Sequence, residues 1–89
     1  MPFVYMVVCR DGTLYTGWTT DVETRVSTHN AGRGSVYCKH RRPVRLVYQE
    51  ELPTRSAAQR REIAIKRLPR DKKLELSKAW TASRDQVLD

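Results

Sequence analysis

The chain has 89 residues, of which 17 are basic and 10 acidic, so its formal net charge is +7 at pH 7. This length fits one domain and leaves little room for a second hydrophobic core. The basic balance favours polyanionic partners, namely DNA, RNA or an acidic membrane surface, without distinguishing among them. No apolar run approaches the roughly 20 residues that a membrane span requires, so no membrane association is expected.

The first apolar run, over residues 3–9, lacks a basic leader and a small-residue cleavage site. It therefore predicts a strand and not a signal peptide. Cys9 and Cys38 are the only cysteines, and they show no metal-ligand spacing. In the absence of an export signal, reduced thiols and a cytoplasmic location are the expectation.

A second short strand is predicted over residues 14–19, after an Asp-Gly turn that favours a tight hairpin. A three-residue loop over 10–12 would place Tyr5 and Tyr15 on the same face of the sheet. A two-residue loop would place them on opposite faces. The sequence leaves both registers open.

The rest of the chain predicts one more strand and three helices. In chain order they are a helix after a Thr20–Glu23 capping box, a strand over 44–48, a helix from a Ser56–Gln59 capping box to about Leu68, and a short helix from Asp71 to about Trp80. The order β-β-α-β-α-α predicts an α/β or α+β domain over residues 1–80, with helices on one or both faces of a three-stranded sheet. Residues 81–89 are expected to form a frayed tail.

Several side chains that could take part in catalysis or binding also have simpler, purely structural explanations. Arg25 and His29 lie four residues apart and share a face of the first predicted helix, next to the tyrosines of the hairpin. They could form an anion site, although an isolated pair is more simply a solvated helix face. Glu62 could pair with Lys66 within its own helix. The two tyrosines could be an ordinary cross-strand packing pair.

The segment from residue 33 to 42 is a basic, glycine-containing loop. Its candidate contacts to nucleic-acid phosphates are Lys39, Arg41 and Arg42, and Tyr37 is available to stack on an exposed base. A solvated, flexible loop is the alternative interpretation.

An ordered set of motifs resembles the GIY-YIG nuclease superfamily, and most closely its small stand-alone bacterial proteins with a single domain. The resemblance covers about residues 3–80 and implies a three-stranded antiparallel sheet flanked by helices, with the active groove on one sheet face. The motifs that carry it are Phe3-Val4-Tyr5, Tyr15-Thr16-Gly17, Arg25 and His29 on the next helix, and Glu62 on a later helix.

The resemblance also implies roles for these residues. Tyr15 would be the general base or water-activating group, and Tyr5 would help to position water or metal. Arg25 would hold the scissile phosphate, and His29 would lie near the substrate. Glu62 would bind a divalent cation, Mg²⁺ or Mn²⁺, weakly until nucleic acid is present.

The function implied by the resemblance is metal-dependent hydrolysis of phosphodiester bonds in DNA, in preference to RNA, with structured or single-stranded DNA as substrate and a link to DNA repair or processing. The alternatives are a non-catalytic nucleic-acid-binding module of the same fold and a basic interaction domain. The sequence departs from the family pattern in having no asparagine after Glu62, where active repair and homing members resemble one another in carrying one.

Overall fold

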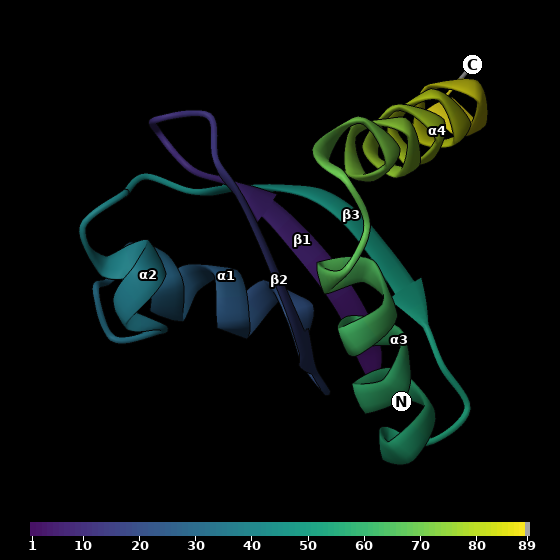
Figure 1. The fold of residues 1–89 in the computed structure, drawn as a ribbon, viewed down its shortest axis with the longest axis horizontal. Helices are drawn as coiled ribbons and strands as arrows, with labels where there is room; N and C mark the ends of the chain where they lie inside the picture. The colour runs from purple at the N-terminus through teal and green to yellow at the C-terminus, as the bar shows by residue number, and fades with distance from the viewer. Residues whose placement is uncertain (89) are drawn as a thin grey trace.

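The apolar run near the amino terminus forms the central strand of a three-stranded antiparallel sheet (Figure 1). A computed structural model describes residues 1–88, with side chains through residue 84. The strands are β1 (Phe3–Val8), β2 (Leu14–Thr19) and β3 (Arg45–Glu51), in the spatial order β2-β1-β3. The expected sheet is confirmed, and β2 lies at one of its edges.

The hairpin between β1 and β2 adopts the register of the three-residue loop. Tyr5 pairs with Gly17 and Val7 pairs with Tyr15. The backbone N–H of Cys9 donates to the carbonyl of Thr13 at 2.8 Å, which closes the loop. Because side chains alternate along a strand, Tyr5 and Tyr15 point from the same face of the sheet.

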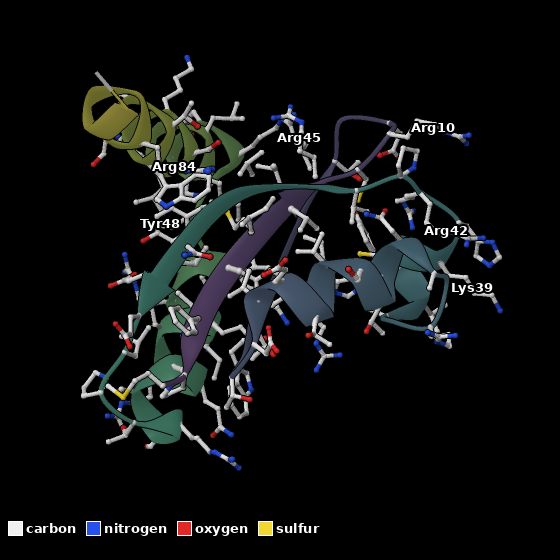
Figure 2. The ribbon with its side chains drawn as sticks, turned by 180° about the vertical axis from the view of Figure 1, so that it is seen from behind. Arg10, Lys39, Arg42, Arg45, Tyr48 and Arg84 are labelled. Carbon is white, nitrogen blue, oxygen red and sulfur yellow. The ribbon has the colours of Figure 1, made fainter. Side chains whose placement is uncertain are left out.

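Helices cover both faces of the sheet (Figures 1 and 2). On one face lie α1 (Val22–Asn30) and the one-turn helix α2 (Val36–Lys39), and on the other lie α3 (Arg55–Lys66) and α4 (Arg70–Leu88). Each face has its own core. The first contains Tyr5, Val7, Cys9, Val22, Cys38 and Val44, and the second contains Val4, Met6, Val47, Tyr48 and Ile65.

In both predicted capping boxes, the residue expected at the N-cap position is not the residue that caps the helix. The carboxylate of Asp21, not the hydroxyl of Thr20, accepts the backbone N–H of Thr24 at 3.1 Å, and it also accepts the Thr24 hydroxyl at 2.8 Å. Asp21 therefore satisfies two donors at the start of α1. The helix α3 begins at Arg55, because its cap is Thr54, two residues before the expected Ser56. Thr54 is extended, and its hydroxyl accepts the backbone N–H of Ala57 at 3.0 Å.

Two further segments differ from the expectation. The basic segment 33–42 is not wholly a loop, since Ser35 caps the short helix α2 within it. The helix α4 continues through Leu88 and does not end near Trp80, because no glycine or proline interrupts it there. Residue 89 lies outside the described residues, and the division into a domain over 1–80 and a tail stays an expectation.

The third strand is longer than expected and irregular. Met6 pairs with Tyr48 while Val7 pairs with Leu46, so Val47 is an additional residue in a bulge. Val47 and Tyr48 consequently both enter the core beneath α3 and α4. None of the helices in the described part of the chain is long and apolar enough to cross a bilayer.

Candidate active site

A cleft of about 320 Å³ brings together the five residues that the sequence singles out for catalysis and metal binding. They are Tyr5 from β1, Tyr15 from β2, Arg25 and His29 from α1, and Glu62 from α3. Because α1 and α3 cover opposite faces of the sheet, the cleft spans the open edge formed by β2. The expected groove on a single sheet face thus extends around this edge.

Tyr5 and His29 form the buried floor of the cleft. The Tyr5 side chain is 2% exposed and His29 is 1% exposed, so His29 is not part of a solvated helix face. The Tyr5 hydroxyl lies 2.8 Å from Nε2 of His29. The backbone N–H of Ser35 donates to Nδ1 at 3.4 Å, which leaves the proton of a neutral imidazole on Nε2. In that tautomer His29 donates to the Tyr5 oxygen.

The electrostatics keep both groups neutral. Burial, and next the positive charge of Arg25, lower the pKa of His29 below its usual value. Burial, reinforced by the neighbouring Tyr15, raises the pKa of Tyr5 far above its usual range, although Arg25 opposes this shift. Tyr5 therefore remains a phenol at neutral pH, and its own proton is available to a group in the cleft.

Two glycines allow these rings to sit where they do. A Cβ atom on Gly17 would lie 2.6 Å from the hydroxyl oxygen of Tyr5 and 2.9 Å from its Cζ. A Cβ atom on Gly34 would lie 2.9 Å from Cγ of His29. Gly17 belongs to a recognised motif, whereas sequence reasoning missed Gly34 and Ser35. Their only signal was a glycine-containing segment after α1.

Tyr15 is half-buried, and two other rings hold its orientation. The ring of His29 meets it edge-on at 5.4 Å between centroids, and the ring of Tyr37 stacks with it at 5.8 Å. The guanidinium of Arg41 lies 4.0 Å from the centroid of Tyr37. Tyr37 is thus already in contact with Arg41 and Tyr15, and it supports Tyr15 in this structure. The two strand tyrosines pair with other residues across the hairpin, not with each other.

Arg25 and Glu62 bring opposite charges to the cleft. Within residues 1–84, Arg25 has no ion-pair partner, and its side chain is exposed. Glu62 lies 3.7 Å from Nζ of Lys66, which is the ion pair expected within its helix. That pair does not withdraw the carboxylate from the site, because Glu62 also lines the cleft.

Glu62 is the only carboxylate among the residues lining the cleft. No group of three or more potential metal ligands of the His, Cys, Asp and Glu types occurs in the described part of the chain. Such a donor set does not suit Zn²⁺, which takes three or four protein ligands. It fits Mg²⁺, which keeps several waters and takes its other ligands from substrate phosphate.

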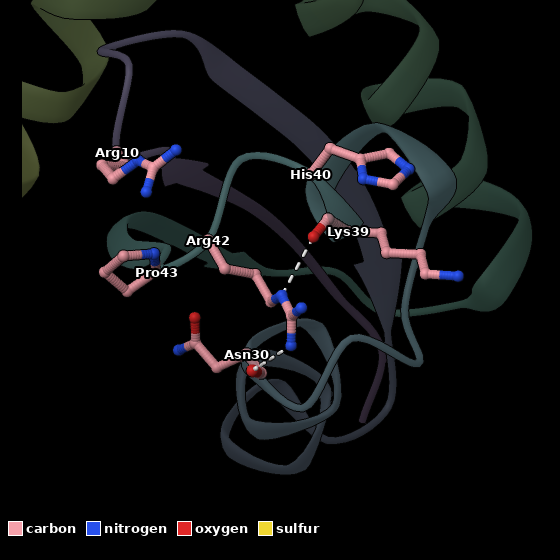
Figure 3. A pocket seen from close by; sticks show the side chains of 6 residues that line it. All are labelled: Arg10, Asn30, Lys39, His40, Arg42 and Pro43. Atoms are coloured by element: carbon pink, nitrogen blue, oxygen red, sulfur yellow. Dashed lines mark hydrogen bonds between the residues drawn. The ribbon is translucent and has the colours of Figure 1, made fainter.

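The basic segment 33–42 lines a second hollow, of about 460 Å³, beside the carboxyl ends of α1 and α2. Figure 3 shows its residues: Arg10, Asn30, Lys39, His40, Arg42 and Pro43. The Arg42 guanidinium donates to the carbonyl of Lys39 at 2.9 Å and to that of Asn30 at 3.4 Å. Arg42 therefore holds two helix ends together.

Arg41 is also engaged within the fold. Its guanidinium lies 3.3 Å from the carboxylate of Asp11 and donates to the carbonyl of Tyr37 at 2.8 Å. Lys39, in contrast, is exposed, and its ammonium group extends away from the other residues in Figure 3. The three predicted phosphate contacts thus lie in one region, but they differ in how freely each can bind.

Residues 1–75 match the family model described as the GIY-YIG catalytic domain. The chain belongs to the GIY-YIG family. This GIY-YIG chain is 55% identical to a UPF0213 protein of Staphylococcus haemolyticus over 74 residues. The matched region covers 83% of this chain and 90% of that relative. It is 57% identical over 76 residues to a UPF0213 protein of Staphylococcus aureus, which covers 85% and 93% of the two chains.

Two solved structures share the fold of this GIY-YIG domain. The UPF0213 protein BH0048 from Bacillus halodurans is 41% identical, with a TM-score of 0.57 over 89% of this chain and 85% of the other. The protein EF2693 from E. faecalis is 38% identical, with a TM-score of 0.59 over 90% and 85%. The domain therefore makes up most of these relatives as well. Membership places the chain in a nuclease superfamily, whose substrate is nucleic acid.

Proposed function

We propose that the protein is a divalent-metal-dependent nuclease that hydrolyses phosphodiester bonds in DNA, with structured or single-stranded DNA as substrate and DNA repair or processing as its setting. The observation that carries this proposal is the convergence of Tyr5, Tyr15, Arg25, His29 and Glu62 on one cleft. They come from four different elements, and phenol, guanidinium and carboxylate groups together supply what phosphodiester hydrolysis needs.

Tyr15 is the residue that we assign to activate the attacking water. Tyr5 is unsuited to this role because it is buried and its raised pKa keeps it protonated. Tyr15 is half-exposed and lines the cleft. Its hydroxyl oxygen accepts a proton from water as the water oxygen bonds to phosphorus, while the proton that the hydroxyl carried passes to solvent. The bond from phosphorus to the leaving oxygen then breaks, and solvent protonates that oxygen.

Tyr5 and Arg25 act on the phosphate and its surroundings. Since His29 donates to the Tyr5 oxygen, the Tyr5 hydroxyl can donate into the cleft, to water or to a phosphate oxygen. Arg25, which has no ion-pair partner within residues 1–84, is available to hold the scissile phosphate in charge-assisted hydrogen bonds. It stabilises the negative charge that develops as the new bond forms.

Glu62 is the residue that would hold Mg²⁺ or Mn²⁺. Its pairing with Lys66 is long and half-exposed, so it competes weakly for the carboxylate. A bound divalent cation would supply Lewis-acid stabilisation to the phosphate oxygens. With one protein carboxylate, the affinity is expected to be low until nucleic acid supplies further oxygen ligands.

The binding surface that we propose for DNA is the basic segment 33–42 with its neighbour Arg10. Lys39, Arg41 and Arg42 are its phosphate contacts, and the second hollow adds Arg10 to them. We also place the protein in the cytoplasm, a proposal with which two free, buried cysteine thiols are compatible.

A binding module of the same fold without turnover is the second candidate. The observation that favours it is the absence of an asparagine after Glu62. Salt-sensitive binding is common to both candidates, since phosphate contacts release counterions. Metal-dependent cleavage is expected only of the nuclease.

The deciding experiment is cleavage of labelled single-stranded, duplex, flap and branched DNA, with matching RNAs. Each substrate is incubated with Mg²⁺, with Mn²⁺ and with a chelator, and the Tyr15→Phe protein is run alongside. Metal-dependent cutting that the variant loses supports the nuclease and shows its preferred substrate. Binding without any cutting favours the module, and the absence of both contradicts the proposal.

A further inference from the structure

A smaller hollow, of about 260 Å³, adjoins the active-site cleft. It is lined by Trp18, Thr19 and Thr20 at the end of β2, by Arg25 on α1, and by Arg55 at the start of α3. Trp18 and Arg25 also line the cleft itself. The active-site cleft and the smaller hollow therefore form one groove along β2, with Arg25 where they meet. The strand β2 lies between α1 and α3 (Figure 1).

The charge in this part of the groove is positive and unbalanced. Arg25 and Arg55 are both exposed, and neither has an ion-pair partner or a side-chain hydrogen bond within residues 1–84. No acidic residue lines the hollow. Asp21, which follows the lining residue Thr20 in the sequence, directs its carboxylate to the backbone and hydroxyl of Thr24 at the start of α1.

We propose that this hollow holds the nucleotide adjacent to the scissile phosphate, with the phosphate of that nucleotide on Arg55. The inference rests on the proposed function, in which Arg25 holds the scissile phosphate. A polynucleotide presents a negative charge at each nucleotide. A strand that enters the cleft along β2 therefore brings its next phosphate to the next available cation, which is Arg55.

Trp18 completes this subsite as its apolar wall. Its half-buried side chain lines both the active-site cleft and the smaller hollow. The sugar and base of the adjacent nucleotide would therefore pack against the indole. Contacts between aromatic side chains and bases tolerate any base, because each base has an apolar face. The subsite consequently recognises the continuing chain of a nucleic acid, and not a particular sequence.

The test measures binding of a labelled oligonucleotide by fluorescence anisotropy at several salt concentrations. A Tyr15→Phe background, in which cleavage is removed, is used for every protein. Arg55→Ala should raise the Kd about tenfold at low salt, as for loss of one charge-assisted contact. It should also reduce the slope of log affinity against log salt by about one.

Arg60→Ala is the matched control, because it removes the same charge from the same helix. Arg60 is exposed, donates to the Ser56 hydroxyl at 2.8 Å, and lines neither the active-site cleft nor the smaller hollow. Its Kd and salt slope should equal those of the parent protein. If Arg55→Ala behaves like Arg60→Ala while the parent binds with a steep salt dependence, this subsite is refuted and the proposed function stands. If the parent does not bind, both proposals fail.

A second readout reports on Trp18 directly. The chain has two tryptophans, so Trp80→Phe leaves Trp18 as the only indole fluorophore. Addition of an unlabelled oligonucleotide to this protein should change the Trp18 emission intensity, with the midpoint at the Kd from anisotropy. Emission that stays constant through saturation would remove Trp18 from the subsite.

Discussion

The hydroxyl oxygen of Tyr5 lies 2.8 Å from Nε2 of His29, and both side chains are almost fully buried. This contact separates the roles of the two motif tyrosines. Tyr5 is held as a neutral hydrogen-bonding group at the floor of the cleft, whereas Tyr15 is only half-buried. The distinction leads to different expectations for each residue.

Tyr15→Phe should reduce the cleavage rate by at least about 100-fold, as expected for loss of a general base. The ring contacts with His29 and Tyr37 do not require the hydroxyl, so folding should be retained. Cleavage of a labelled oligonucleotide with Mg²⁺ measures the rate, and circular dichroism checks the fold. A variant with the parent rate would remove Tyr15 from the role of base.

Glu62→Gln should abolish metal-dependent cleavage, because the cleft loses its only carboxylate while the side chain keeps its size. The rate is measured as a function of Mg²⁺ concentration. The control is Glu75→Gln on α4, whose carboxylate pairs with Lys72 at 3.5 Å on an exposed surface. The metal assignment would be contradicted by a Glu62→Gln protein that retains the metal response of the control.

Gly17→Ala should lower the free energy of unfolding by about 1–3 kcal/mol, since the new methyl group would overlap the Tyr5 hydroxyl. Urea denaturation measures the change. Tyr5→Phe removes the nearest atom, so the double variant should lose less stability than the sum of the two single variants. Strict additivity would show that the two residues do not compete for this space.

His29 should make stability depend on pH between neutral and mildly acidic conditions. Its pKa is lowered in the folded state, so the unfolded chain binds the proton more readily. The contribution of His29 is complete above the unfolded pKa of about 6.5 and declines as pH falls toward the lower folded pKa. Urea denaturation at pH 7.5 and 5.5 should show this loss, and His29→Gln should reduce it. An equal loss in the variant would assign the pH dependence to other groups.

Lys39 and Arg42 should separate binding from stability within the basic segment. Lys39→Ala should weaken DNA binding while leaving the free energy of unfolding within about 0.5 kcal/mol, as for an exposed surface residue. Arg42→Ala should lower the free energy of unfolding by about 1 kcal/mol, because the carboxyl ends of α1 and α2 lose a shared hydrogen-bond donor. Anisotropy and urea denaturation measure the two effects. If Lys39→Ala binds DNA with unchanged affinity and salt dependence, this residue lies outside the binding surface.

Much of the local structure could be predicted because it depends on short stretches of sequence. The apolar run from residue 3 to 9 indicated a strand, and Asp11-Gly12 indicated a hairpin turn. The exact start of a helix is harder to predict, because several residues that can cap a helix occur close together. At α1 both Thr20 and its neighbour Asp21 could cap the helix, and in the structure Asp21 has the extended backbone and the side-chain hydrogen bond of the N-cap.

The bulge in β3 shows a different limit. Strand alternation predicted that successive side chains would point to opposite faces. Instead, Val47 and Tyr48 enter the same core, because the pairing with β1 shifts by one residue between Met6 and Val7. Such a shift depends on how the strand packs between the helices, which no local pattern reports.

The sequence by itself determined the family, the order of the elements and the residue types that carry the proposed chemistry. Only the tertiary structure decided that Tyr5 and Glu62, far apart in the chain, line one cleft at the edge of β2. It also chose between the two hairpin registers and revealed the close approach of Gly17 to Tyr5. The physical reason is that chemical identity belongs to single residues, whereas distance, burial and the pKa shifts that follow from them arise only when separate elements pack together.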